Sequence, residues 1–465
     1  MAMLAAIGIY FLFEFKGVQI RRIPEQVRLI WKDSSIDSNG NRMSSFQGFC
    51  MGLGQRIGIG NIIGVATAIL LGGPGSIFWM WIFAVFGAAT SFVESTLGQI
   101  FKRKNSNGQF YGGPAYYIKD GLKKHELAVF FAVWTVITYG VGFIANVSAN
   151  VSGAFESLVD LNYMSIFVAV SLAALTAFLV FGGIMRMSRM AEKVVPYMAI
   201  GWLVLAGLAI ILNWRLIDDV LILIVRDAFD VTKIVAGFAG SCIMWGIKRG
   251  IFSNEAGIGS IPCVSSTADV KHPIHQGYVQ SMGVLIDTLV VCTASAFPIL
   301  IAFPEGLSGL GYDANDGIII VESALNCIFG GDWLKYVLTA FIFVFAFTSI
   351  VGNYSISESN LRFLTDKPEA ITVHKSLAVA VVFVSAILPI SLVWNIVDIL
   401  MAIMSIVNVY VLFRLSKYVV SAHNDYRRQK DDGVEEPVFS VETLEKDGLD
   451  VSGVVSWDAD SADCR

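Results

Sequence analysis

The chain has 465 residues, of which 55% are hydrophobic and only 15% are charged, and its formal net charge is −5. A soluble globular chain carries about 25% charged residues, so this composition excludes an ordinary soluble domain. Apolar stretches of about 20 residues recur along nearly the whole sequence, and each can cross a hydrocarbon core about 30 Å thick. The strict alternation of a transmembrane barrel is missing, which leaves an all-α polytopic membrane protein.

Eleven apolar runs lie between charged residues or Gly/Pro punctuation, and we interpret each as one membrane span. The runs cover residues 2–15, 46–70, 75–99, 127–151, 163–183, 194–213, 232–252, 275–303, 333–360, 376–392 and 394–416. The first run is short for a bilayer and contains Glu14, so we expect that the natural chain begins upstream of Met1. A signal peptide is the alternative, but no basic segment precedes the apolar run.

Lysine and arginine are distributed unevenly among the loops, and short cytoplasmic loops collect these residues. They fill the loops at 16–42 and 102–124 and return at 186–193, whereas the loops at 71–74, 152–162 and 304–316 contain none. This alternation predicts an N-terminus outside the membrane and a C-terminus in the cytoplasm.

The second span is expected to be a broken helix because it combines glycines with the polar residues Arg56 and Asn61. Its glycines are Gly52, Gly54, Gly58, Gly60 and Gly64. Each costs roughly 1 kcal/mol relative to alanine inside a helix, and freed backbone groups in lipid must find partners elsewhere. Unwound carbonyls can surround a small cation, while the amides of a half-helix N-terminus can hold a carboxylate. Close helix packing is the alternative, and the spacing of Gly60 and Gly64 fits it.

The seventh span repeats this pattern and then runs into Ser253-Asn254-Glu255. Its glycines and polar or aromatic residues are Gly237, Gly240, Ser241, Trp245, Gly246 and Gly250. Two halves of five spans, residues 46–213 and 232–418, would then each open with a discontinuous helix. An odd number of spans inverts the topology, so the prediction is the 5+5 inverted repeat described for LeuT-like transporters.

The remaining segments lie outside these halves. Residues 1–45 would form an extra N-terminal helix and a basic cytoplasmic loop, and residues 214–231 an external connection. Residues 419–465 form a tail that is polar, acidic and poor in aromatic residues. Such composition favours a disordered cytoplasmic end.

Several polar residues inside the later spans are candidates for ion binding or gating. Thr348 and Ser349 interrupt an aromatic and aliphatic run in the fourth helix of the second half, where we interpret them as part of a cation site. The alternative is that each hydroxyl bonds back to its own helix. Asp287 and Asp398 are acids within spans, and we expect them to act in gating or proton coupling.

The sequence resembles the alanine/glycine:cation symporter family, also called sodium:alanine symporters. The resemblance is carried by GIGNIIGVATAILLGGPGSIFWMWIFAVFGAATSFVEST from Gly58, YGGPAYYI from Tyr111 and MWGIKRGIFSNEAGIGSIP from Met244, and it continues through HPIHQG, DTLVVCT and VWNIVDIL. It extends from the first loop to about residue 418 and leaves the acidic tail outside.

The resemblance implies import of alanine, glycine or a similar small amino acid, coupled to Na⁺ or alternatively H⁺, across the inner membrane of a bacterium or archaeon. The implied sodium site comprises carbonyls near Gly54 and Ile57 together with Thr348 and Ser349. The implied amino-acid pocket is lined by Gly58, Ile59, Gly60 and Asn61, facing Cys242, Trp245 and Gly246. The family commonly has Thr at the position of Ile59, so this chain lacks one hydroxyl there.

The expected partners are a small amino acid, a monovalent cation and the lipid bilayer, with no nucleic acid and no cofactor beyond the coupling ion. We expect the monomer to be functional. A membrane-embedded enzyme is one alternative, using Asp287, Asp398 or Glu255, but no Ser-His, Cys-His or metal-ligand spacing accompanies these acids. A channel is the other, and it would need a continuous pore.

Overall fold

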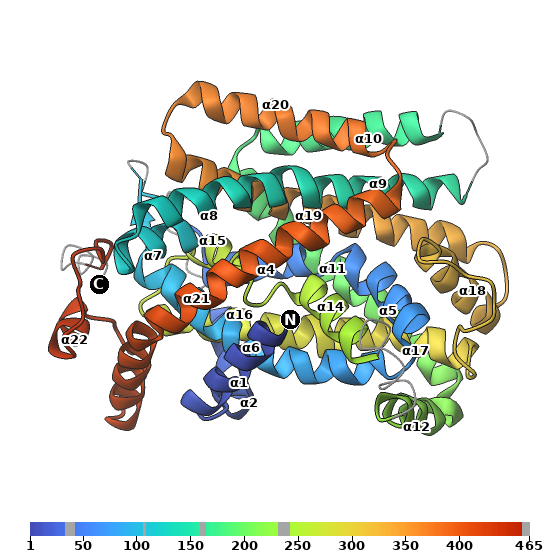
Figure 1. The fold of residues 1–465 in the computed structure, drawn as a ribbon, viewed down its shortest axis with the longest axis horizontal. Helices are drawn as coiled ribbons and strands as arrows, with labels where there is room; N and C mark the ends of the chain where they lie inside the picture. The colour runs from blue at the N-terminus through green and yellow to red at the C-terminus, as the bar shows by residue number, and fades with distance from the viewer. Residues whose placement is uncertain (33–41, 106–107, 159–163, 231–241, 458–465) are drawn as a thin grey trace.

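A computed structural model describes residues 1–32, 42–105, 108–158, 164–230 and 242–457, and these form a bundle of long helices (Figure 1). The strands in this described part are β1 (Arg103–Lys104) and β2 (Phe110–Tyr111), which pair antiparallel beside the start of α7. The architecture is therefore all-α.

Seven helical stretches in the described residues are long and apolar enough to cross a membrane, and a bent pair of helices is an eighth candidate. The seven are α6 (Ser76–Ile100), α8–η2–α9 (His125–Ile137, Thr138–Phe143, Ile144–Glu156), α11 (Ile184–Leu212), α16–η5–α17 (Pro273–Leu285, Ile286–Cys292, Thr293–Ala302), α19 (Leu334–Leu364), α20 (Pro368–Ser385) and α21 (Ile390–Asp431). The bent pair is α4 (Ser45–Arg56) with the π-helical turn η1 (Gly60–Gly64) and α5 (Val65–Gly72).

Shorter helices complete the bundle and its ends. They are α1 (Ala2–Glu14), α2 (Val18–Arg21), α3 (Ile23–Lys32), α7 (Pro114–Gly121), α10 (Met164–Val180), η3 (Trp214–Leu216), α12 (Ile217–Ala228), α14 (Cys242–Asn254), α15 (Ile261–Ser265), α18 (Gly317–Phe329) and α22 (Val441–Lys446). Each of the eleven predicted spans has a helical counterpart, although α1, α10 and α14 are short. The apolar helix α18 was not among the predicted spans.

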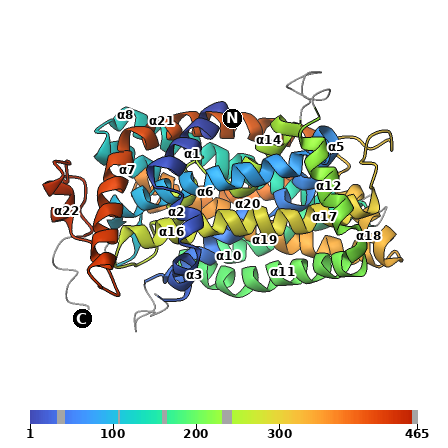
Figure 2. The same cartoon turned by 90° about the horizontal axis from the view of Figure 1, so that it is seen from below.

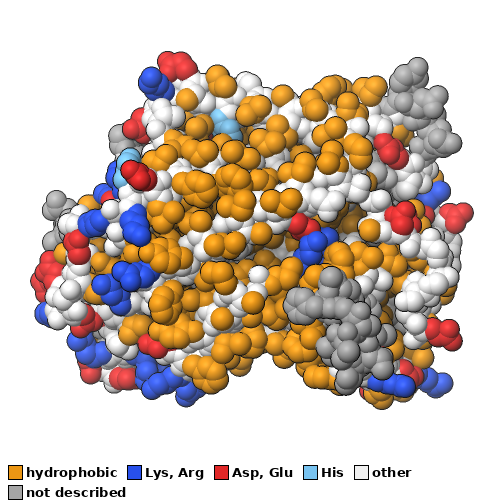
Figure 3. Space-filling view, in the orientation of Figure 1, with side chains coloured by type: hydrophobic (Ala, Val, Ile, Leu, Met, Phe, Trp, Pro, Cys, Tyr) orange, Lys and Arg blue, Asp and Glu red, His pale blue; other side chains and the backbone are white. Residues whose placement is uncertain are grey.

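On the face seen in Figure 3, hydrophobic side chains cover most of the middle, and charged side chains lie mainly towards the ends. Large apolar residues stay exposed on α10, α11 and α21, including Phe167, Phe178, Ile200 and Ile399. Exposed apolar surface on this scale would be unfavourable in water. Of these helices, α11 and α21 are long enough to span a membrane, so this surface is suited to contact with lipid.

The break between α4 and α5 has a local cause. Ser44 and Gln47 form a capping box that fixes the start of α4, with both side-chain to backbone hydrogen bonds at 3.1 Å. The helix ends at Arg56, and Ile57 takes an extended conformation. The chain becomes helical again at η1, and the two halves are bent by 49°.

The second break lies after α14, later in the chain than the glycines that suggested it. The chain unwinds between Asn254 and Ile261, with positive φ at Glu255 (54°), Gly257 (83°) and Gly259 (93°). A side chain is strained at such φ values, so Gly257 and Gly259 are the glycines that the break requires.

The glycines of the seventh predicted span do not lie at this break. Gly246 and Gly250 lie within α14, where a β-carbon on Gly246 would come within 2.4 Å of the Ser76 carbonyl oxygen. They serve close packing of α14 on α6. Gly237, Gly240 and Ser241 lie outside the described residues, as does most of the first half of the predicted span 232–252.

The expected external connection, residues 214–231, contains the helix α12, which lies across one end of the bundle (Figure 2). It docks on the turn before α6. The backbone N–H of Gly75 donates to Asp227 Oδ2 at 2.8 Å, and Trp79 Nε1 donates to the Ala228 carbonyl at 3.2 Å. The connection is therefore a packed element.

The C-terminal tail differs from the disorder expected of it. α21 continues to Asp431, α22 follows, and residues up to 457 pack against the ends of the helices. Trp457 Nε1 donates to the Gln99 carbonyl at 3.0 Å, and the ammonium of Lys102 lies between the rings of Phe110 (4.1 Å) and Trp457 (4.3 Å). A few apolar residues hold the tail in place: Phe439, Leu444, Val454 and Trp457. Because the tail as a whole is polar and acidic, its average composition does not indicate these residues.

Candidate functional site

Asn61 connects the two broken helices. Its Oδ1 accepts a hydrogen bond from the backbone N–H of Gly58 at 2.9 Å, and its Nδ2 donates to Asp287 Oδ1 at 2.6 Å. The other carboxylate oxygen of Asp287 accepts from Ser253 Oγ, at the end of α14, at 2.7 Å. Asp287 is fully buried and satisfied by these polar neighbours. It therefore holds the first break against the second.

Arg56 makes a second connection at the end of α4. Its guanidinium donates to the carbonyl of Asn254 (Nε, 2.9 Å), to the carbonyl of Gln280 (Nη1, 3.0 Å) and to Ser91 Oγ (Nη2, 2.9 Å). The last carbonyls of a helix have no partner within it. Arg56 thus caps the C-terminal end of α14 from the other broken helix.

Glu255 and Gln55 form a polar bridge between the breaks and α19. Gln55 Nε2 donates to Glu255 Oε1 at 3.0 Å and to Asn353 Oδ1 at 2.6 Å. Glu255 Oε2 accepts from Tyr139 OH at 3.1 Å and from Ser260 Oγ at 2.6 Å. All these side chains are buried.

Glu94 anchors the unwound segment from α6. Its two carboxylate oxygens accept from the backbone N–H of Gly257 at 3.2 Å and from Asn408 Nδ2 at 3.1 Å. This is the packing and loop-anchoring role that its place near a helix end suggests.

The π-helical turns of the described residues all occur beside the two breaks. η1 carries Asn61, η2 carries Tyr139 and Phe143, and η5 carries Asp287 and Cys292. A π-helical turn adds one residue to a helix and is frequent at functional sites. Here each turn presents a polar or aromatic side chain to the same region.

A small cavity lies between the first break, α9, the end of α14 and α19, and we call it the central cavity. Its lining includes Gln55, Gly58, Ile59, Gly60, Phe143, Asn146, Phe252, Glu255, Ser349 and Asn353. Four buried polar atoms of this lining have no hydrogen-bond partner among the described residues: Gln55 Oε1, Asn146 Nδ2, Ser349 Oγ and Asn353 Nδ2. Buried polar atoms are normally paired, so the cavity is suited to a polar ligand.

The structure brings together the four residues expected to bind a cation. A β-carbon on Gly58 would lie 2.5 Å from Ser349 Oγ, and one on Gly54 would lie 3.8 Å from Thr348 Cβ. Ile57 ends α4 between them. Thr348 Oγ1 bonds back to the Phe345 carbonyl at 2.9 Å and keeps its lone pairs as acceptors. Carbonyl and hydroxyl oxygens are ligands that suit a hard monovalent cation.

Cys242, Trp245 and Gly246 are not brought to the central cavity. Cys242 Sγ lies 3.7 Å from the Ala228 carbonyl of α12, and the Cβ of Trp245 lies 2.7 Å from the position of a β-carbon on Gly72. These residues pack α14 on α12 and the α5–α6 turn. The lining from this helix is Phe252 and Glu255, about two to three turns further along.

Four aromatic rings lie in a row beside the central cavity. Ring centroids are 4.7 Å apart for Tyr139 and Phe143, 5.4 Å for Phe143 and Phe252, and 4.6 Å for Phe252 and Trp394. Asp398, one turn along α21 from Trp394, pairs with Lys248 at 2.7 Å. We call the rings and this ion pair the aromatic barrier.

Some lining residues were not singled out from the sequence. Asn353 is one helical turn from Ser349, so it lies on the same face of α19, and this spacing could have indicated it. Gln55 is next to Arg56 in a glycine-rich stretch. Phe143 and Phe252 carry no such signal, because an aromatic residue in a span is usually lipid-facing or packed.

Two five-helix halves that each open with a broken helix, and whose breaks meet at a polar cavity, define a secondary transporter of the LeuT type. The crystal structure of MhsT in complex with L-phenylalanine has this fold, with a TM-score of 0.54 and 15% identity, covering 80% of this chain and 88% of that one. Residues 1–441 match the model of the sodium:alanine symporter family. The chain belongs to that family.

Relatives match over nearly the whole chain. It is 40% identical to the probable sodium/glutamine symporter GlnT of Bacillus subtilis (98% of this chain, 92% of GlnT) and 36% identical to the amino-acid carrier protein AlsT of the same organism (95% and 92%). The sodium/alanine symporter AgcS of Methanococcus maripaludis is 32% identical (92% and 95%). The protein is therefore a multi-pass membrane transporter that couples amino-acid movement to a cation, and it is not an enzyme.

Proposed function

We propose that this chain imports a small neutral amino acid, with alanine or glycine as the first candidates, together with Na⁺ by alternating access. The observation that carries the proposal is the set of unpartnered polar atoms in the central cavity, at the point where α4 breaks. Donors and acceptors occur side by side there, as a zwitterion requires.

In the proposed bound state, the backbone amides at the start of η1 and the Asn353 amide group hold the carboxylate, since a helix N-terminus favours an anion. Gln55 Oε1 accepts from the ammonium group. Na⁺ is held by the carbonyls of Gly54 and Ile57 and the hydroxyls of Thr348 and Ser349.

Two barriers would open in turn. The aromatic barrier, with Asp398 paired to Lys248, closes one side of the central cavity. The bridge from Gln55 to Asn353 and Glu255 closes the other. Asp287 acts as a positioning residue, because it fixes Asn61 and hence the geometry of the first break.

The proposed setting is the cytoplasmic membrane of a bacterium or archaeon, with the protein acting as a monomer. The N-terminus lies outside and the C-terminus inside. Support for this orientation comes from the basic loop at 102–124, where Lys123 donates to Ser452 of the ordered tail. The start of α11, which carries the basic residues at 186–193, lines the same cavity as Phe110 of that loop.

L-Glutamine is a second candidate substrate, because GlnT, a probable sodium/glutamine symporter, is 40% identical over 98% of this chain. Ile59, buried in the lining of the central cavity, supplies an apolar contact where the family commonly has a hydroxyl. Such a change alters the fit of the substrate side chain without affecting the backbone groups that hold the zwitterion.

The test is transport by purified protein in proteoliposomes. Uptake of radiolabelled L-alanine, glycine and L-glutamine is measured with an inward Na⁺ gradient, with an H⁺ gradient alone, and with neither. We expect saturable, Na⁺-dependent uptake and counterflow of at least one of them. Uptake that ignores both gradients contradicts the symport mechanism, and ion currents without counterflow would indicate a channel.

A further inference from the structure

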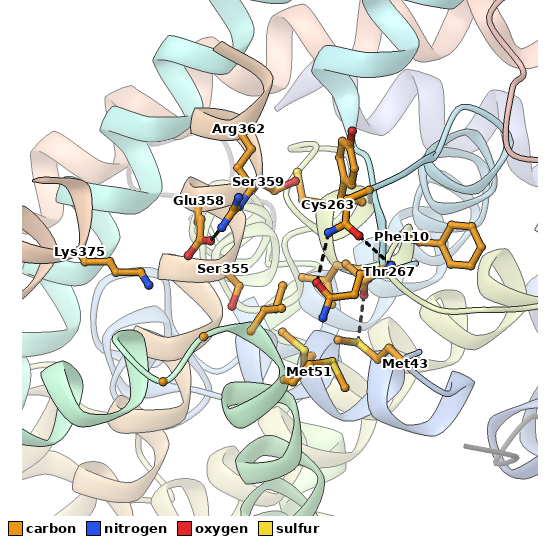
Figure 4. A pocket seen from close by; sticks show the side chains of 18 residues that line it. Met43, Met51, Phe110, Cys263, Thr267, Ser355, Glu358, Ser359, Arg362 and Lys375 are labelled. Carbon is orange, nitrogen blue, oxygen red and sulfur yellow. Dashed lines mark hydrogen bonds and ion pairs between the residues drawn. The ribbon is translucent and has the colours of Figure 1, made fainter. Parts of the chain in front are cut away.

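A second, larger cavity lies one helical turn beyond the central cavity, and we call it the inner vestibule (Figure 4). Its volume is about 320 Å³, which is within the range of small-molecule sites. It lies between α4 and α15 on one side and α19 and α20 on the other. The β1–β2 hairpin and the turn before α11 line its mouth, and both belong to the basic loops expected to face the cytoplasm.

The two walls of the vestibule differ in chemistry. Ser355, Glu358 and Arg362 of α19 and Lys375 of α20 form a polar and charged wall. Met43, Met51, Phe110 and Cys263 form an apolar wall opposite, as Figure 4 shows. A ligand with both charges at one end and a variable side chain at the other matches this division.

The charged wall carries both signs. Arg362 donates to a single carboxylate oxygen of Glu358, with Nε–Oε1 at 2.9 Å and Nη2–Oε1 at 2.5 Å. The hydroxyl of Tyr354, one helical turn before Glu358, interacts with the same carboxylate, and Glu358 is only 6% exposed. A largely buried carboxylate at the wall of a cavity favours a cationic donor such as an ammonium group. Lys375 lines the same wall and supplies a positive charge.

The vestibule is separated from the central cavity by one layer of side chains. Met51 faces the vestibule and Gln55 faces the central cavity, and four residues of α-helix correspond to a rise of about 6 Å. On α19, Ser355 lines the vestibule and Asn353 lines the central cavity. A molecule leaving the central cavity must break the hydrogen bond from Gln55 to Asn353 and then enters the vestibule.

We propose that the inner vestibule is a second binding site for the transported amino acid, in which Glu358 receives the ammonium group and Lys375 the carboxylate. This inference rests on the proposed symport function and adds a site that lies outside the central cavity. Methionine side chains adapt their shape to different partners, so the opposite wall accepts more than one substrate side chain. The site holds the amino acid before its release, once the bridge from Gln55 to Asn353 and Glu255 has opened.

The test measures how many molecules bind to the purified full-length chain. Equilibrium binding of radiolabelled L-alanine and L-glutamine is followed in saturating Na⁺ for the wild type, Glu358→Gln and Lys375→Gln. We expect two sites per chain in the wild type, one of them weaker. Each variant should weaken that site by about tenfold or more, corresponding to about 1.4 kcal/mol, and leave the tighter site unchanged.

Matched controls come from the same part of the chain. Lys367→Gln and Glu369→Gln change the same residue types at exposed positions at the start of α20, outside the lining of the vestibule, and both should keep two sites. One site in the wild type, or two unchanged sites in both Glu358→Gln and Lys375→Gln, overturns the inference and leaves symport standing. A wild type that binds neither amino acid overturns the proposed function as well.

Discussion

At the scale of single residues, the hydroxyl of Ser349 links the first break to α19. It lies against Gly58, it is buried, and it has no hydrogen-bond partner among the described residues. Most serine hydroxyls in helices bond back to a carbonyl of their own helix, as Ser405 does to Met401 at 2.8 Å. Ser349 therefore keeps its oxygen available for a cation.

We expect Ser349→Ala to raise the Na⁺ concentration for half-maximal uptake by about tenfold or more, because an interaction with a charged partner contributes about 1.5–3 kcal/mol. Initial uptake against Na⁺ concentration in proteoliposomes measures this. Ser405→Ala is the matched control and should behave as the wild type. An unchanged Na⁺ dependence in Ser349→Ala would show that the cation binds elsewhere.

At this scale the sequence predicts some residues well. Gly54 lies beside Thr348, and Gly58, next to Ile57, lies beside Ser349. The resemblance assigns these residues by position, and their role in binding a cation stays a prediction. Glycine in a sequence has no single meaning, however. Gly246 permits close packing of two helices, whereas Gly257 permits a positive φ, and only the backbone conformation distinguishes these uses.

At the scale of whole elements, Arg56 connects α4 to α14 and α16. It donates to carbonyls at the end of α14 and within α16, and it is almost fully buried. Without it, the Asn254 carbonyl at the end of α14 would lose its partner in a buried region, and such a loss costs about 1–3 kcal/mol.

Arg56→Ala should lower the melting temperature of the purified protein by about 5 °C or more. Thermal unfolding in detergent, followed by intrinsic fluorescence, provides the measurement. Arg21→Ala, an exposed arginine at the end of α2, serves as the control and should melt with the wild type. A normal melting temperature for Arg56→Ala would mean that water replaces the guanidinium.

The ion pair between Asp398 and Lys248 connects α21 to α14 beside the aromatic barrier. Arg249 Nη1 lies 3.8 Å from the same carboxylate, and removing any member of this largely buried group unbalances its charges. Asp398→Asn and Lys248→Gln should each reduce the uptake rate by about tenfold or more.

The charge-reversed double variant, Lys248→Asp with Asp398→Lys, gives the decisive comparison for this pair. It should recover part of the uptake rate, because the attraction is restored with the charges exchanged. If the double variant is no better than the single ones, the two residues act separately.

Element boundaries were harder to predict than elements. Eleven spans follow from apolar length, and each has a helix, but the second break falls at Glu255 to Ser260 and not among the glycines of α14. The reason is physical: a helix breaks where its backbone groups find other partners. The partners of this break, Glu94 and Arg56, are distant in sequence.

For the whole molecule, the ordered tail is the largest departure from the sequence-based expectation. Its average composition is that of a disordered segment, yet single apolar residues such as Leu444 and Trp457 bury against the ends of the bundle. Tail docking also buries Lys102, and this burial lowers the pKa of its ammonium group from 10.5 to about 7.

Because the pKa of Lys102 is lowered in the docked form, the strength of tail docking should depend on pH, and the direction can be derived. A released tail exposes Lys102, which then binds a proton more readily than in the docked form. Docking should therefore tighten as pH rises from about 7 towards 10.5, by at most about 1.4 kcal/mol per pH unit, and should be independent of pH below 7.

Protease protection of the tail between pH 6 and 9.5 measures this effect. The wild-type cleavage rate, divided by that of Lys102→Met at the same pH, should fall as pH rises above 7. The ratio removes the pH dependence of the protease itself. A constant ratio would show that another group controls the tail.

The three π-helical turns beside the two breaks affect how the chain tolerates the deletion of a single residue. An ordinary helix that loses one residue rotates everything after it by about 100°, so such a deletion normally destroys a membrane span. A π-helical turn already contains one surplus residue, and removing it restores a regular helix with both flanks in register. Single-codon deletions within η2 or η5, which have α-helix on both sides, should therefore yield protein that inserts and folds, as judged by monodisperse gel filtration, but no longer transports. Deletions within the uninterrupted helices α6 or α19 should yield no stable protein. Such an in-frame deletion would separate the folding of the chain from its transport activity.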